Sequence, residues 1–166
     1  MLGLGKDRLS IYLNDHLAAA TAGANLARRT ATSNEGTSYG SGLEAVALEI
    51  EQDRAALAYV MQRLSVGQDQ LKIALAWAAE RAGRLKLNGR LLGYSPLSRL
   101  EEIEALSLGV EGKLALWRAL SSTHGSDPRL ADVGLANLID RAQSQRRRLE
   151  SLRTRAADEA LAQRSG

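Results

Sequence analysis

The sequence predicts an all-α fold, an antiparallel four-helix bundle with an additional shorter helix, and three observations support this prediction. The 166 residues are rich in Ala, Leu, Arg and Glu, which are good helix formers. Apolar residues recur at alternating spacings of three and four, which is the period of one helix face. Two helix start signals, each a capping residue followed by proline, divide the second half of the chain. Long helices joined by short loops favour antiparallel neighbours.

The composition limits the class of protein. We expect a single domain over residues 1–166, with a core at about 6–160, because this length suffices to bury a core. The chain has no cysteine, which excludes disulfides and thiolate metal sites and fits a reducing compartment. No apolar run approaches the roughly 20 residues of a membrane span, and the first residues lack the apolar stretch of a signal peptide. We therefore expect a cytoplasmic protein that does not contact membranes.

The first two predicted helices cover the N-terminal part of the chain. The first runs over about residues 6–32 and is followed by a polar loop at 33–40. The second begins at Ser41, which has capping-box spacing with Glu44. It ends before residues 66–68, where a glycine follows the last apolar position.

The third predicted helix, over residues 69–92, is apolar on more than one side. Such a helix packs between other elements or at a subunit contact. Ile73, Trp77 and Leu91 are the predicted interface residues, and Trp77 is the strongest anchor among them. This second apolar face predicts a homodimer.

The last two helices have the clearest predicted starts. Ser95 is the expected N-cap of the fourth, with Pro96 as its first residue, and residues 124–125 end it. Asp127 and Pro128 are expected to start the fifth helix in the same way. These signals leave only a short connection between the two helices.

Polar residues interrupt four of the five apolar stripes near mid-helix, and charged residues flank two of them. Mid-helix positions of antiparallel neighbours meet at the same height, so the pattern predicts a polar layer across the core. The residues of this predicted layer are His16, Asp53, Glu104, Ser107, Glu111, Gln145 and Arg146.

Four long helices with inward carboxylates near their centres resemble the ferritin-like superfamily. The resemblance covers roughly residues 6–160, and residues 86–100 also look like uncharacterised actinobacterial proteins of this type. It implies an antiparallel bundle. In the di-metal members, two helices each supply a Glu and two others each supply a Glu-x-x-His pair.

This chain departs from the metal-binding pattern of that superfamily. Leu13 and Ser121 stand three residues before His16 and His124, which are the only histidines, so the sequence contains no Glu-x-x-His. A guanidinium at Arg146 would also repel a cation. We therefore expect no metal ligands, no cofactor and no catalytic residues.

Three functions remain open from the sequence. The leading hypothesis is a non-catalytic interaction or structural module whose layer is made of hydrogen bonds or ion pairs, such as Asp53 or Glu111 with Arg146 and His16 with a carboxylate, because buried charges need partners. The alternative is an atypical metal-binding or oxidative enzyme that uses His16, Asp53, Glu104 and Glu111.

The third function is binding of nucleic acid or an acidic protein partner through a basic segment. Between residues 71 and 100, Glu80 is the only acidic residue. A solvated face is the favoured interpretation, because aromatic residues do not alternate with the basic ones there. The basic residues of the segment are Lys72, Arg81, Arg84, Lys86, Arg90 and Arg99.

Overall fold

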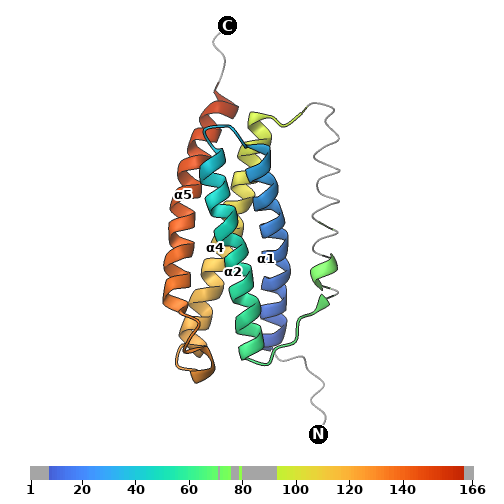
Figure 1. Ribbon diagram of the computed structural model, residues 1–166, viewed down its shortest axis with the longest axis vertical. Helices are drawn as coiled ribbons and strands as arrows, with labels where there is room; N and C mark the ends of the chain where they lie inside the picture. Colours follow the sequence, from blue (N-terminus) through green and yellow to red (C-terminus); the bar gives the residue numbers. More distant parts are fainter. Residues whose placement is uncertain (1–7, 71, 76–78, 80–92, 163–166) are drawn as a thin grey trace.

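The computed structural model describes residues 8–70, 72–75, 79 and 93–162, and this part of the chain contains helices and no strand. The long helices run side by side (Figure 1). They are α1 (Arg8–Ser33), α2 (Gly40–Arg63), α4 (Pro96–His124) and α5 (Leu135–Leu161). A short 3-10 helix, η1 (Pro128–Leu130), stands between α4 and α5 in the chain. The predicted all-α class is confirmed.

The long helices pack as two hairpins. α1 packs along α2, α4 packs along α5, and the two hairpins meet mainly where α1 lies against α4. The backbones of α2 and α5 come close at few points. The seam between α2 and α5 therefore leaves room for long side chains.

Two apolar clusters fill the interior, and α1, α2, α4 and α5 all contribute to each. One cluster contains Trp117, and we call it the lower cluster. The other, the upper cluster, contains Tyr39, which is 1% exposed. Burying one leucine contributes about 1.5–3 kcal/mol. The fully buried leucines and isoleucine of the two clusters are Leu13, Leu17, Leu43, Leu57, Ile103, Leu114, Leu116, Leu120 and Leu149.

The N-terminus of α4 is capped as the sequence predicts. The Ser95 hydroxyl accepts a hydrogen bond from the backbone N–H of Ser98 at 3.1 Å, and Pro96 is the first helical residue. The bond satisfies one of the N–H groups that a helix start leaves without a partner.

The predicted start of the fifth helix at Asp127 is wrong. Asp127 and Pro128 begin η1 instead, and α5 begins at Leu135 after Gly134, which has φ 67°. The side chain of Leu130 is buried in the lower cluster, so the chain turns inward there before it enters α5. The capping signal is local and specifies a helical turn, but it does not specify how long the helix continues.

The predicted capping box at Ser41 is also wrong. α2 begins one residue earlier, and its N-cap residue, Tyr39, makes no side-chain cap bond. A turn that begins at Thr37 precedes it, in which the Thr37 carbonyl accepts from the N–H of Gly40 at 3.1 Å. A Cβ atom at Gly40 would lie 2.8 Å from the Asn34 carbonyl oxygen, so this close approach requires glycine.

The third predicted helix is described only at its beginning. Gln70, residues 72–75 and residue 79 are helical, and Ile73 packs against the lower cluster. Trp77 and Leu91, the other two predicted interface residues, lie outside the described residues. Within the described part of the chain, no helix is both long and apolar enough to cross a membrane.

Candidate functional site

A buried polar layer separates the upper and lower apolar clusters. Its centre is Asp53 on α2 and Gln145 on α5, whose side chains are 1% and 0% exposed. The amide nitrogen of Gln145 donates to Oδ2 of Asp53 at 3.0 Å. The two predicted layer residues that are fully buried therefore contact each other across the α2–α5 seam.

Two cations bind the Asp53 carboxylate. The Lys113 ammonium, from α4, donates to Oδ2 of Asp53 and to Oε1 of Gln145. The Arg141 guanidinium, from α5, donates to Oδ1 through Nε at 2.7 Å and through a second nitrogen. Both carboxylate oxygens are thus occupied, and the group of one carboxylate with two cations carries a local charge of about +1.

A second ion pair continues the layer along the same seam. The Arg148 guanidinium donates to Oε2 of Glu49, and the amide nitrogen of Gln145 donates to that oxygen at 3.1 Å. Gln145 therefore joins the two carboxylates. Long polar side chains bridge the part of the interior where the backbones of α2 and α5 stay apart.

Burial lowers the pKa of the Lys113 ammonium, and the neighbouring Asp53 carboxylate raises it in part. The lowered pKa indicates that desolvation outweighs the attraction of the ion pair. A buried pair of this kind adds little net stability but is costly to break. It also favours one alignment of α2, α4 and α5, because only that alignment satisfies all of its groups.

Two further predicted layer residues are half-buried. The Ser107 hydroxyl donates to the Ile103 carbonyl of its own helix at 2.9 Å. The His16 ring packs edge-on against Tyr12, with ring centroids 4.6 Å apart. Burial lowers the pKa of His16, and the Asp15 carboxylate raises it in part.

The remaining predicted layer residues lie at the surface and not in the core. Arg146 and Glu111 form an ion pair at 3.2 Å with about half of each side chain exposed. Glu104 lies 3.7 Å from Arg153, also at the surface. These residues flank the apolar stripes, where a long side chain reaches water and so avoids the cost of desolvation. The partners of Asp53 are accordingly Lys113 and Arg141, and Arg146 is not among them.

Sequence reasoning missed the cations of the layer. The burial of Lys113 could have been predicted, because it stands three residues after Val110 and four before Trp117, within the buried stripe of α4. The directions of Arg141 and Arg148 could not have been predicted, because each stands beside a buried position and can turn inward or outward. The packing of α5 against α2 decides their direction.

The four hypothetical metal ligands do not come together. Asp53 is held by Lys113 and Arg141, His16 packs on Tyr12, and Glu104 and Glu111 face solvent. Among the described residues, no group of three or more His, Cys, Asp or Glu side chains could hold a metal ion.

The basic segment is described only at its two ends. Lys72 pairs with Asp15 at 2.7 Å. Arg99 pairs with Glu159 at 2.9 Å and lies over the Tyr39 ring, 4.4 Å from its centroid. The other four basic residues, which lie outside the described part of the chain, are Arg81, Arg84, Lys86 and Arg90. Binding of nucleic acid through this segment stays a prediction.

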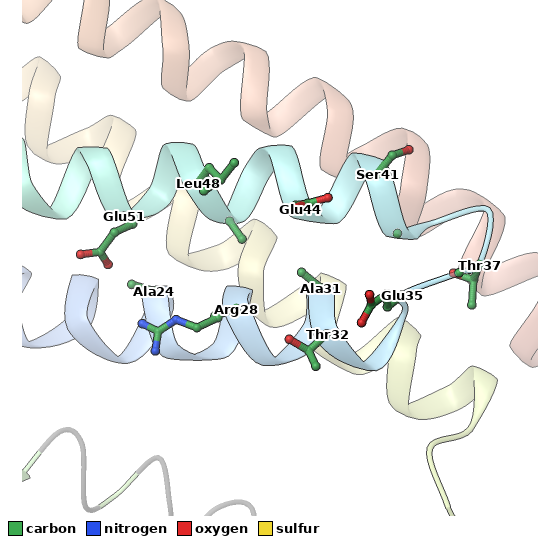
Figure 2. Close-up of a pocket in the computed structure, with 13 residues that line it drawn as sticks. Ala24, Arg28, Ala31, Thr32, Glu35, Thr37, Ser41, Glu44, Leu48 and Glu51 are labelled. Atoms are coloured by element: carbon green, nitrogen blue, oxygen red, sulfur yellow. The ribbon is translucent and has the colours of Figure 1, made fainter.

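A groove of about 550 Å³ lies between α1 and α2, and we call it the α1–α2 groove. Figure 2 shows that its lining side chains come from both helices and from the loop that joins them. Within the described residues, Glu35 and Glu44 form no ion pair, and the Leu48 side chain is 62% exposed. The groove is lined by Ala24, Arg28, Ala31, Thr32, Glu35, Gly36, Thr37, Gly40, Ser41, Glu44, Ala47, Leu48 and Glu51.

A smaller cavity of about 250 Å³ lies between α1, α2 and α4, and we call it the α1–α4 pocket. Its walls are mostly apolar, and Lys113 and Asp53 of the polar layer reach it. Trp117 also lines it, and the buried indole N–H of Trp117 has no acceptor among the described residues. The pocket is open to solvent on the α4 side, where Leu108, Gly109 and Gly112 are exposed. It combines mostly apolar walls with a few polar groups, as small-ligand sites do.

No protein-family model, no curated protein and no solved structure matches this chain. Both oxygens of Asp53 and Oε2 of Glu49 accept internal hydrogen bonds, whereas the buried Nε of Arg148 has no acceptor among the described residues. Binding is the chemistry that this arrangement supports.

Proposed function

We propose that the chain is a ferritin-like, antiparallel four-helix bundle that acts as a non-catalytic interaction module and forms a homodimer through the α1–α2 groove. The observation that carries the proposal is that one face combines a hollow, an exposed leucine and charges of both signs that form no ion pair among the described residues, namely Arg28, Glu35 and Glu44. A two-fold interface brings the same patch of each copy together, so the patch must be complementary to itself.

The charges of the groove meet this requirement. Within the described residues, Arg28 makes one long hydrogen bond, 3.4 Å to Oδ1 of Asn25. Glu35 and Glu44 line the same groove without an ion pair. A two-fold arrangement lets Arg28 of one copy face Glu44 of the other. Such pairs favour the correct partner and the correct register.

The apolar part of the groove also fits a second copy. Ala24, Ala31 and Ala47 form a shallow floor, because their short side chains do not fill the space between the helices. Leu48 protrudes beside it. In the dimer, Leu48 of each copy would pack on the alanines of the other, and each buried leucine contributes about 1.5–3 kcal/mol.

The polar layer supports a non-catalytic role. Both oxygens of Asp53 are occupied by donors from Lys113, Arg141 and Gln145. Oε2 of Glu49 accepts hydrogen bonds from Arg148 and Gln145. A carboxylate held as Asp53 is suits the alignment of helices better than proton transfer or metal binding, which require a free lone pair.

The first experiment measures the molecular mass by light scattering at micromolar concentration. We expect a dimer for the wild-type chain and a monomer for Leu48→Glu. The matched control is Leu161→Glu, because Leu161 is 65% exposed at the end of α5 and does not line the groove. A monomeric wild-type chain would contradict the dimer, and a dimeric Leu48→Glu variant would contradict this face.

A charge exchange tests the pairing across the interface. Arg28→Glu and Glu44→Arg should each weaken dimerisation, because each places like charges opposite one another. The double variant restores opposite charges and should recover most of the lost affinity. A double variant that is weaker than both single variants would show that these residues do not pair between copies.

A further inference from the structure

We propose that the α1–α4 pocket binds a small apolar molecule that carries one carboxylate group. The pocket lies on a different side of α1 from the dimer face, so this inference does not depend on the proposed homodimer. Its size, its glycines and the remaining N–H donor of Lys113 support it independently.

The volume sets the size of the ligand. An apolar cavity of about 150 Å³ accommodates benzene, so 250 Å³ accommodates about ten non-hydrogen atoms. A carboxylate with eight carbon atoms in all, such as octanoate, has ten non-hydrogen atoms and therefore this size. Leu57, Leu106 and Leu116 provide the apolar wall for such a chain.

Glycines keep the pocket open although packing does not require them. Gly23 on α1 and Gly109 and Gly112 on α4 line it, and a Cβ atom at any of them would meet nothing within 4 Å. A glycine inside a helix costs about 1 kcal/mol relative to alanine. Glycine therefore lowers helix stability at three positions that line the same pocket. The absence of side chains at these positions leaves space for a ligand.

The polar groups of the pocket favour a hydrogen-bond acceptor with negative charge. Asp53 cannot serve a ligand as an acceptor, because both of its oxygens already receive hydrogen bonds. The Lys113 ammonium has three N–H donors, of which Asp53 and Gln145 take two. The third N–H of Lys113 forms no hydrogen bond among the described residues and is the donor that a ligand carboxylate would meet.

The local charge also favours a ligand with negative charge. Lys113 and Arg141 together exceed the charge of Asp53 by one. A carboxylate at the Lys113 end would neutralise this excess in a desolvated place, where an opposite charge is favoured most. An alkylammonium ion of the same size would meet an excess positive charge instead.

The test uses octanoate as the probe and the full-length chain with Trp77→Phe, so that Trp117 is the only tryptophan. We expect saturable quenching or a spectral shift of Trp117 with one octanoate per chain. Octylammonium should bind at least tenfold more weakly than octanoate, and the affinity for octanol should lie between the affinities for these two ions. Absence of saturable octanoate binding would overturn the proposal, as would equal affinity for octylammonium.

A variant that fills the pocket tests its location. Gly112→Leu in the same background should weaken octanoate binding at least tenfold, whereas Ala136→Leu should not change it, because Ala136 is exposed on α5, which does not line the pocket. Circular dichroism checks that both variants are folded. Unchanged binding by Gly112→Leu would show that octanoate binds elsewhere and would overturn the assignment. Lys113→Met should reduce the preference for octanoate over octanol, which a purely structural lysine would leave unchanged.

Discussion

Lys113 on α4 donates a hydrogen bond to the buried carboxylate of Asp53 on α2, at the height where the upper and lower apolar clusters meet. Gln145 on α5 bonds to both residues. Hydrogen bonds among these three side chains therefore join α2, α4 and α5 at one point, and each side chain bonds to the other two. The stability of the layer depends on Asp53 in particular, because it is the acceptor for both cations.

The first prediction concerns the removal of that acceptor. Asp53→Ala should lower the free energy of unfolding by about 3–5 kcal/mol, because Lys113 and Arg141 would lose their buried carboxylate. Urea denaturation followed by circular dichroism measures this loss. Glu111→Ala is the control, since it breaks an exposed ion pair and should cost less than about 1 kcal/mol. Equal losses for the two variants would contradict the role assigned to the layer.

The second prediction compares two serines near helix starts. Ser95→Ala should destabilise the protein by about 1 kcal/mol, because the Ser95 hydroxyl accepts from the N–H of Ser98. Ser41→Ala should change stability little, because Ser41 is exposed and does not cap α2. Thermal unfolding at neutral pH distinguishes the two. A larger loss at Ser41 would support the capping box that the structure does not show.

The third prediction compares two glycines. Gly40→Ala should destabilise the protein by about 1–3 kcal/mol, because its Cβ would lie 2.8 Å from the Asn34 carbonyl oxygen. Gly112→Ala should stabilise it by up to about 1 kcal/mol, since its Cβ meets open space inside a helix. Chemical denaturation curves give both values. Changes of the same sign would contradict the different surroundings of these two glycines.

The fourth prediction concerns alkaline pH. Burial raises the pKa of Tyr94 to about 12, and the Glu102 carboxylate, which accepts from its hydroxyl at 3.0 Å, acts in the same direction. Between pH 10 and 12 the unfolded chain loses this proton while the folded chain keeps it, so stability falls as pH rises through this range. Tyr94→Phe should therefore flatten the alkaline decline in unfolding free energy.

Absorbance near 295 nm, which reports phenolate formation, follows the same titration. Tyr12→Phe is the matched control, because the hydroxyl of Tyr12 has no hydrogen-bond partner among the described residues. If the two variants decline equally between pH 10 and 12, the raised pKa of Tyr94 does not contribute to stability.

Part of the polar layer was predictable from the sequence. Asp53 and Gln145 interrupt apolar stripes at the spacing of the buried positions, so a helix that buries its stripe must bury them as well. Glu104, Glu111 and Arg146 flank the stripes. Periodicity does not separate a flanking residue that turns inward from one that reaches solvent, and these three were placed in the core in error.

The sequence alone determined the helical class, the approximate extents of α1, α2 and α4, and the burial of Asp53, because side-chain spacing along one helix decides which residues share a face. Only the tertiary structure decided that Lys113 and Arg141 are the partners of Asp53, that Asp127 starts η1 instead of α5, and where the two hollows lie. Each of these depends on what a distant part of the chain places opposite a helix, and the period of a single helix contains no information about its neighbours.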